Sequence, residues 1–121
     1  MVGVDLLIGA PAEGILMGWI FLAVAGALEV SFTTAMKYAE GFTKLWPSLV
    51  FVVAYGASAV FLAQAVKTIP LGTAYAVWTG IGAVGTALVG IALFGEPVTA
   101  LRLLFLALIV GGIVGLKLVS P

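Results

Sequence analysis

Four long apolar runs separated by short polar breaks make up most of the sequence. They cover residues 17–36, about 46–66, about 71–94 and about 100–119. Each run is long enough to cross a bilayer, which takes about 20 helical residues. The pattern predicts an all-α integral membrane protein with four transmembrane helices in one domain, residues 17–121. Because the connections are only a few residues long, consecutive helices should be antiparallel neighbours.

The polar breaks carry signals for the ends of these helices. Pro47 lies in the first turn of the second run, where its missing N–H does no harm. Gly95-Glu96-Pro97 should end the third run, and Thr99 is a candidate N-cap for the fourth. Residues 1–16 contain Asp5, Glu13 and Pro11 but no basic residue, which does not fit a secretory signal. We expect them to form a poorly ordered N-terminal extension.

Composition supports a membrane protein and excludes most chemistry. The 121 residues are 64% hydrophobic and 8% charged, whereas soluble domains have about 25% charged residues. Net charge is zero with no basic block, which disfavours nucleic-acid binding. Without Cys or His there is no disulfide, thiolate nucleophile or imidazole base. We therefore predict a protein that is not an enzyme, with no cofactor and no metal site.

The basic residues are divided almost evenly between the two ends of the predicted bundle. Lys67 and Lys117 fall on one side, and Lys37, Lys44 and Arg102 on the other. This split gives the positive-inside rule little to act on. The chain could insert in both orientations and form an antiparallel homodimer. The alternative is a single orientation set by other features.

One carboxylate, Glu29, lies near the middle of the first run. A charge at that depth costs roughly 2.5–3.5 kcal/mol on insertion scales. Such residues face protein or water and mark ion or proton sites by default. The alternative is a structural salt bridge or hydrogen bond, but every Lys and Arg lies at or beyond the end of a run.

Several residues could help Glu29 to bind an organic cation. Gly26, Phe32 and Thr33 lie three or four positions from Glu29, on the same helix face. Tyr75 and Trp78, also three apart, offer aromatic faces that attract cations, although an interfacial aromatic belt is the alternative. Ser58, midway along the second helix, could bond to a carboxylate or to its own backbone.

Small residues cluster on the third and fourth runs. Gly80 and Gly82 permit either a bend in the third helix or close packing. In the fourth, Ala107, Gly111 and Gly115 repeat at spacing four, a face suited to close helix contact. Four helices are few to enclose a substrate path, so we expect this face to pack in a dimer.

These motifs together resemble the small multidrug resistance family of proton-coupled exporters. The matching stretches are Gly26-Ala-Leu-Glu-Val30 and residues 36–48, 69–82 and 108–112, the last ending in Gly111-Gly112. The resemblance implies an antiparallel homodimer in the inner membrane that exchanges protons for cationic substrates. It implies that Glu29 is the essential carboxylate, Tyr75 and Trp78 the substrate-site aromatics, Ser58 a contact of the carboxylate, and Gly80–Gly82 the kink.

The sequence resembles two subtypes of the family. Features of the guanidinium exporters are Gly26, Ser58, Thr79–Ala83 and Leu116-Lys117, and features of the quaternary-ammonium and polyaromatic-cation exporters are Thr33-Thr34 and Glu40–Ser48. Guanidinium exporters of the family typically have a Trp where this chain has Phe32, which has no N–H to hold Glu29. This difference favours export of hydrophobic cations such as quaternary ammonium or aromatic compounds. A guanidinium exporter is the alternative, and a non-transporting structural subunit is a further one. Whether the partner is an identical chain or a paralogue stays open.

Overall fold

The computed structural model describes residues 12–120, and these residues form four helices and no strand. The helices are α2 (Ala12–Tyr38), α3 (Leu45–Ala65), α4 (Leu71–Phe94) and α5 (Ala100–Val119). All four are long and apolar enough to cross a membrane. The predicted all-α membrane fold is confirmed, and the bounds of α3, α4 and α5 agree with the apolar runs to within one residue.

The first helix starts earlier than the sequence analysis expected. Residues 12–16, assigned to the N-terminal extension, are the first residues of α2. Ile15 and Leu16 continue the apolar run, and Gly14 alone does not end a helix. Residues 1–11, the rest of the predicted extension, lie outside the described part of the chain.

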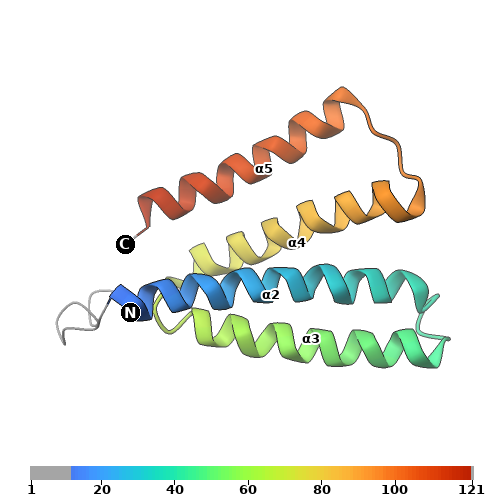
Figure 1. Cartoon of the computed structure of the whole chain (residues 1–121), viewed down its shortest axis with the longest axis horizontal. Helices are drawn as coiled ribbons and strands as arrows, with labels where there is room; N and C mark the ends of the chain where they lie inside the picture. The colour runs from blue at the N-terminus through green and yellow to red at the C-terminus, as the bar shows by residue number, and fades with distance from the viewer. Residues whose placement is uncertain (1–11, 121) are drawn as a thin grey trace.

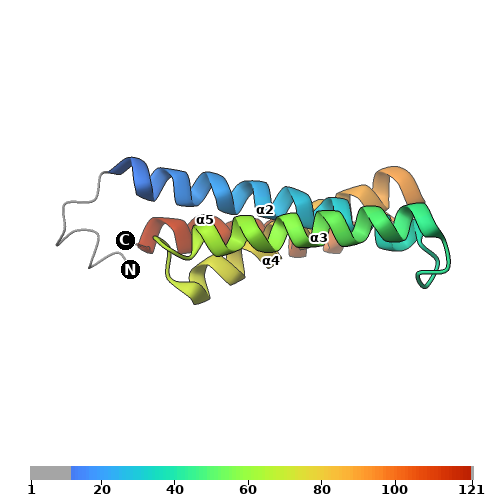
Figure 2. The same ribbon diagram turned by 90° about the horizontal axis from the view of Figure 1, so that it is seen from below.

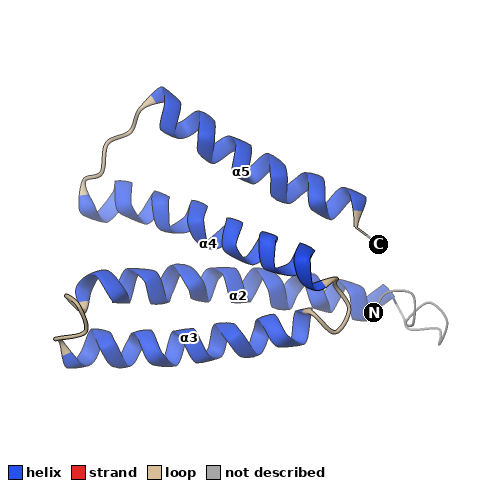
Figure 3. Cartoon of the chain, turned by 180° about the vertical axis from the view of Figure 1, so that it is seen from behind, coloured by secondary structure: helices blue, strands red, loops and turns tan. Residues whose placement is uncertain are grey.

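The helices run alternately up and down along one long axis, so the start of α2 and the end of α5 lie at the same end of the bundle (Figure 1, Figure 2). α2 packs against both α3 and α4, whereas α5 packs on α4 and reaches α2 through Lys117, whose Nζ lies 5.6 Å from the centre of the Trp19 ring. The view from behind shows α5 at one edge and α3 at the other, with α4 and α2 between them, and the connections as short loops (Figure 3). Glu29 lies in the second half of α2, which packs against α3 and α4, and therefore has protein on two sides.

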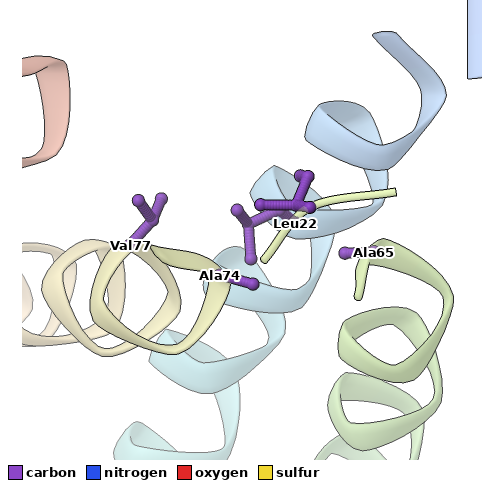
Figure 4. Packing of buried hydrophobic residues seen from close by; sticks show 5 residues of the cluster. Leu22, Ala65, Ala74 and Val77 are labelled. Carbon is purple, nitrogen blue, oxygen red and sulfur yellow. The ribbon is translucent and has the colours of Figure 1, made fainter. Parts of the chain in front are cut away.

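The apolar core lies towards the end of the bundle that contains the α3–α4 connection. It consists of Leu22, Ala65, Ile69, Ala74 and Val77, packed together from α2, α3, the connection and α4 (Figure 4). Most other large apolar side chains, including those of α5, are exposed. Lipid tails are as apolar as these side chains, so exposure costs little in a membrane.

The helix ends confirm two expectations from the sequence. Thr99 Oγ1 accepts a hydrogen bond from the Arg102 N–H at 3.1 Å, as an N-cap should. Gly95 ends α4 in the left-handed conformation, with φ of 64°, which suits glycine. At the same end of the bundle, the α2–α3 connection holds an exposed ion pair between Glu40 and Lys44, 3.6 Å apart.

Candidate functional site

The Glu29 carboxylate lies against the backbone of α4 at Gly82. A Cβ atom added to Gly82 would overlap Glu29 Cδ and Oε2, so any larger residue there would displace the carboxylate. Oε2 is buried and has no hydrogen-bond partner within residues 12–120. The ion pairs in this part of the chain involve Glu40 and Glu96, not Glu29. The structural salt bridge weighed as an alternative is therefore absent from the described chain.

A cavity of about 390 Å³ adjoins the carboxylate between α2 and α4. Its lining combines small residues, three hydroxyl groups and an ion pair from the α4–α5 end: Glu29, Thr33, Thr79, Gly82, Ala83, Thr86, Ala87, Glu96 and Arg102. Thr33 Oγ1 is 2.6 Å from Thr86 Oγ1, which joins α2 to α4 beside Glu29. The cavity thus places a carboxylate and hydroxyl oxygens around one small space.

The cavity hydroxyls are mainly acceptors. Thr33 Oγ1 donates to the Val30 carbonyl at 3.0 Å, and Thr79 Oγ1 donates to the Tyr75 carbonyl at 2.9 Å. A hydroxyl has one hydrogen and two lone pairs. With its hydrogen donated to the backbone of its own helix, Thr33 accepts the hydrogen of Thr86 and keeps one lone pair, and Thr79 keeps both. Such a site suits a ligand rich in N–H donors.

Ser58 binds neither the carboxylate nor its own backbone, the two options considered from sequence. It is fully buried and donates to the Ala25 carbonyl on α2 at 2.7 Å. Trp78 Nε1 donates to Ser58 Oγ at 3.0 Å and approaches the same carbonyl at 3.3 Å. This network joins α2, α3 and α4 one turn before Glu29 and fixes the helix that carries the carboxylate.

The other predicted substrate residues lie outside this cavity. Phe32 is buried against Phe51 and Tyr55 of α3, with ring centres 5.5 and 5.1 Å away. A Cβ on Gly26 would lie 2.5 Å from Ile81 Cγ2, so Ile81 fills the space expected for a ligand. Tyr75 is 55% exposed, and its ring is 5.6 Å from that of Trp78. Within one chain, only Thr33 of the predicted substrate residues shares the cavity with Glu29.

The glycines of α4 serve close packing in this structure. Gly80 accommodates Ile113 of α5, and Gly82 accommodates Glu29, while α4 stays a single helix. The kink at Gly80 and Gly82 remains a prediction. On α5, Ala107 is exposed, and Gly111, Gly112 and Gly115 have no atom within 4 Å of an added Cβ. The predicted dimer face is therefore uncovered in the single chain.

Sequence analysis missed the α4 side of the cavity. Thr79, Ala83 and Thr86 lie at helical spacing on either side of Gly82, forming one face of small and hydroxyl residues. That spacing was a usable signal. Glu96 and Arg102 gave no such signal, because only the fold brings the α4–α5 connection to the cavity that contains Glu29.

A sequence profile described as Small Multidrug Resistance protein matches residues 17–109. The chain belongs to the small multidrug resistance family. It is 56% identical over 104 residues to a guanidinium exporter of Yersinia pseudotuberculosis, covering 86% of this chain and all of that protein. It is 55% identical over 102 residues to guanidinium exporters of Citrobacter freundii and Salmonella typhimurium, covering 84% of this chain and 97% of each relative.

Membership of this family confirms the resemblance drawn from the motifs. The chain is a small multidrug resistance transporter and a multi-pass protein of the inner membrane. Membership of a transporter family points away from an enzyme. It also disfavours the alternative of a non-transporting structural subunit. The names of the relatives agree with guanidinium export, the alternative of the sequence analysis, better than with export of larger hydrophobic cations.

Proposed function

We propose that this protein exports guanidinium in exchange for protons, with Glu29 as the group that binds each in turn. The observation that carries the proposal is the Glu29 carboxylate, held in a membrane-spanning helix with a buried, unpartnered oxygen beside hydroxyl acceptors. An anionic group without a protein cation is suited to a cation from outside the protein. Identity of 55–56% to proteins named guanidinium exporters supports the choice of cation.

The chemistry of the cavity favours guanidinium over a tetraalkyl cation. Guanidinium is small and planar, and its N–H groups need acceptors to replace water. Glu29, Thr33 and Thr79 supply carboxylate and hydroxyl oxygens within one cavity of about 390 Å³. A tetraalkylammonium ion donates no hydrogen bonds and gains from aromatic contact instead. The aromatic pair Tyr75 and Trp78 does not line this cavity.

Phe32 does not face the Glu29 carboxylate in the way the sequence suggested. From the sequence, the missing Trp N–H at this position meant a loss of support for Glu29. In the structure, Phe32 packs against Phe51 and Tyr55, while Gly82 and the cavity hydroxyls surround the carboxylate. The position of Phe32 therefore no longer argues against guanidinium.

Exchange follows from competition for one carboxylate. A protonated Glu29 carries no charge and binds a cation weakly, whereas a deprotonated one attracts it. Proton and guanidinium then exclude each other at the same oxygens. Proton flow into the cell would drive guanidinium out if the site opens to one side of the membrane at a time.

The proposal includes an antiparallel homodimer. Each described residue of α5 is at least partly exposed, its small-residue face is uncovered, and Tyr75 is open on α4. A second copy would cover α5 and bring further residues to the cavity. Basic residues divided two against three between the ends favour insertion in both orientations. A tag on the C-terminus should then be reachable from both membrane faces, and labelling from one face only would contradict dual topology.

Reconstitution of the purified protein into liposomes tests the function. The wild type should take up guanidinium when protons flow out of the liposomes in exchange, and Glu29→Gln should not. Glu40→Gln, which removes an exposed carboxylate in the α2–α3 connection, is the matched control and should keep proton-coupled uptake. In competition at fixed pH, tetrapropylammonium should displace guanidinium weakly. Ready transport of tetrapropylammonium and none of guanidinium would return the assignment to a hydrophobic-cation exporter.

A further inference from the structure

Glu96, in the connection between α4 and α5, borders two cavities. One is the space of about 390 Å³ that contains Glu29. The other, of about 470 Å³, lies towards the α2–α3 connection and is lined in part by Lys37, Glu40 and Phe94. Glu96, Thr33 and Thr86 line both. A polar strip of one carboxylate and two hydroxyls therefore connects the loop end of the bundle with Glu29.

The fold holds the Glu96 carboxylate over α4. The Glu96 N–H donates to the Gly90 carbonyl at 3.1 Å, which turns the chain back over the end of the helix. A Cβ on Gly90 would lie 2.5 Å from Glu96 Oε2 and 2.6 Å from Oε1, so the carboxylate needs glycine at this position. Gly90 thus does for Glu96 what Gly82 does for Glu29: each glycine leaves room for a carboxylate against α4.

Glu96 already binds a guanidinium group. Arg102 Nη2 donates to Glu96 Oε1 at 3.0 Å. The pair is joined through this one oxygen, and its side chains are 34% and 46% exposed. Exposed, singly bonded ion pairs are weak because water and salt screen them. A free guanidinium ion has the same kind of N–H donors as the Arg102 side chain and could take its place at low cost.

The outer cavity also offers carboxylate oxygens to a cation. Its lining includes two carboxylates, Glu40 and Glu96, and one amine, Lys37. The carboxylates are paired with Lys44 and Arg102, which lie outside this lining. Lys37 Nζ lies 5.8 Å from the centre of the Phe94 ring, a cation–π contact. A cation that enters this cavity therefore meets the Glu96 carboxylate on the way to the cavity of Glu29.

We propose that Glu96 is a second, transient binding site for guanidinium, between the loop end of the bundle and Glu29, where the substrate exchanges with the Arg102 side chain. The inference rests on the proposed function. In an antiparallel dimer, one Glu96 would lie towards each face of the membrane. Arg102 is then a competitor that keeps this site from holding the substrate too tightly.

Opposite effects of two substitutions test the proposal. Glu96→Gln should lower kcat/KM for guanidinium uptake into liposomes by about threefold to tenfold at low salt, since it removes the attracting charge. Arg102→Gln should raise it by about twofold, because Glu96 loses its competitor. Both differences should shrink when salt reaches ~0.5 M. Proton release on guanidinium binding, which reports on Glu29, should keep its midpoint within about twofold in both variants.

A purely structural ion pair predicts a different outcome, since either substitution breaks it and both would change uptake in the same direction. Lys44→Gln breaks the other ion pair at this end and is the control, because Lys44 does not line the outer cavity. If the wild type transports guanidinium but uptake changes in the same direction in Glu96→Gln and Arg102→Gln, or changes in neither, the inference is overturned. Where Glu96→Gln does not fold, Arg102→Gln decides alone: faster uptake supports the site, and unchanged or slower uptake refutes it. A wild type that moves no guanidinium would instead refute the proposed function.

Discussion

The glycines of α4 and α5 have different surroundings. On α4, Gly80, Gly82 and Gly85 are each filled by a side chain of a neighbouring helix, and at Gly82 that side chain is Glu29. On α5, Gly111, Gly112 and Gly115 have only open space where a Cβ would be. Glycine thus allows close packing within the chain on α4, whereas on α5 it forms a face that no other part of the described chain covers. The comparison indicates that this part of α4 is filled within one chain, whereas the small-residue face of α5 lacks a partner.

The largest effect should come from filling the space at Gly82. Gly82→Ala places a methyl group where the Glu29 carboxylate lies, so transport of guanidinium should fall by about tenfold or more. Gly56→Ala on α3 is the control, because a Cβ there meets no atom within 4 Å. The measurement is kcat/KM in liposomes for protein of equal thermal stability. Normal transport by Gly82→Ala would show that Glu29 does not need its present position.

A smaller effect is expected when the bare face of α5 is altered. Gly111→Leu would separate two closely packed helices, and the dimer should dissociate about tenfold more readily, which corresponds to about 1.4 kcal/mol. Subunit exchange in detergent or lipid measures this. Gly56→Leu, which enlarges an exposed glycine on α3, should leave the dimer intact. If Gly111→Leu dimerises like the wild type, the second copy binds elsewhere.

The smallest effect concerns the hydrogen bonds among Ser58, Trp78 and the Ala25 carbonyl, one turn before Glu29. Ser58→Ala removes the 2.7 Å bond to the Ala25 carbonyl and one acceptor of Trp78 Nε1. We expect a loss of about 0.5–1.5 kcal/mol in the free energy of unfolding. Ser48→Ala breaks a bond within a single helix, to the Lys44 carbonyl, and should cost less. Equal losses in the two variants would mean that the network does not hold the three helices together.

Local signals were enough to predict the helices. Apolar runs and helix breakers gave α4 and α5 their bounds, and Thr99 is the N-cap that its type and position suggested. The start of α2 was placed late because residues 1–16, interrupted by Pro11, were set apart as one N-terminal extension. Signals within one stretch of sequence were therefore enough for the bounds of α3, α4 and α5.

The candidate site could be predicted only in part, because it depends on contacts between distant segments. The position of Glu29 in the middle of an apolar run marked it as a candidate site residue. Its contact with Gly82, however, depends on how α2 and α4 approach each other. Thr86 meets Thr33 across 53 positions, and Glu96 reaches the cavity through the turn after α4. Gly26 and Phe32 share a helix face with Glu29, yet neighbouring helices occupy the space around them. Helical spacing gives the direction of a side chain and not what fills the space beside it.

The central claim is that one carboxylate, Glu29, exchanges a proton for guanidinium. Its most direct test is proton release when guanidinium is added to the purified protein in weakly buffered detergent solution. The wild type should release protons, and the guanidinium concentration needed for half of the release should rise as the pH falls, because protons compete for the same oxygens. Glu29→Gln should release none, while Glu40→Gln should match the wild type. Proton release that persists in Glu29→Gln, or binding of guanidinium to the wild type without any release, would contradict the account.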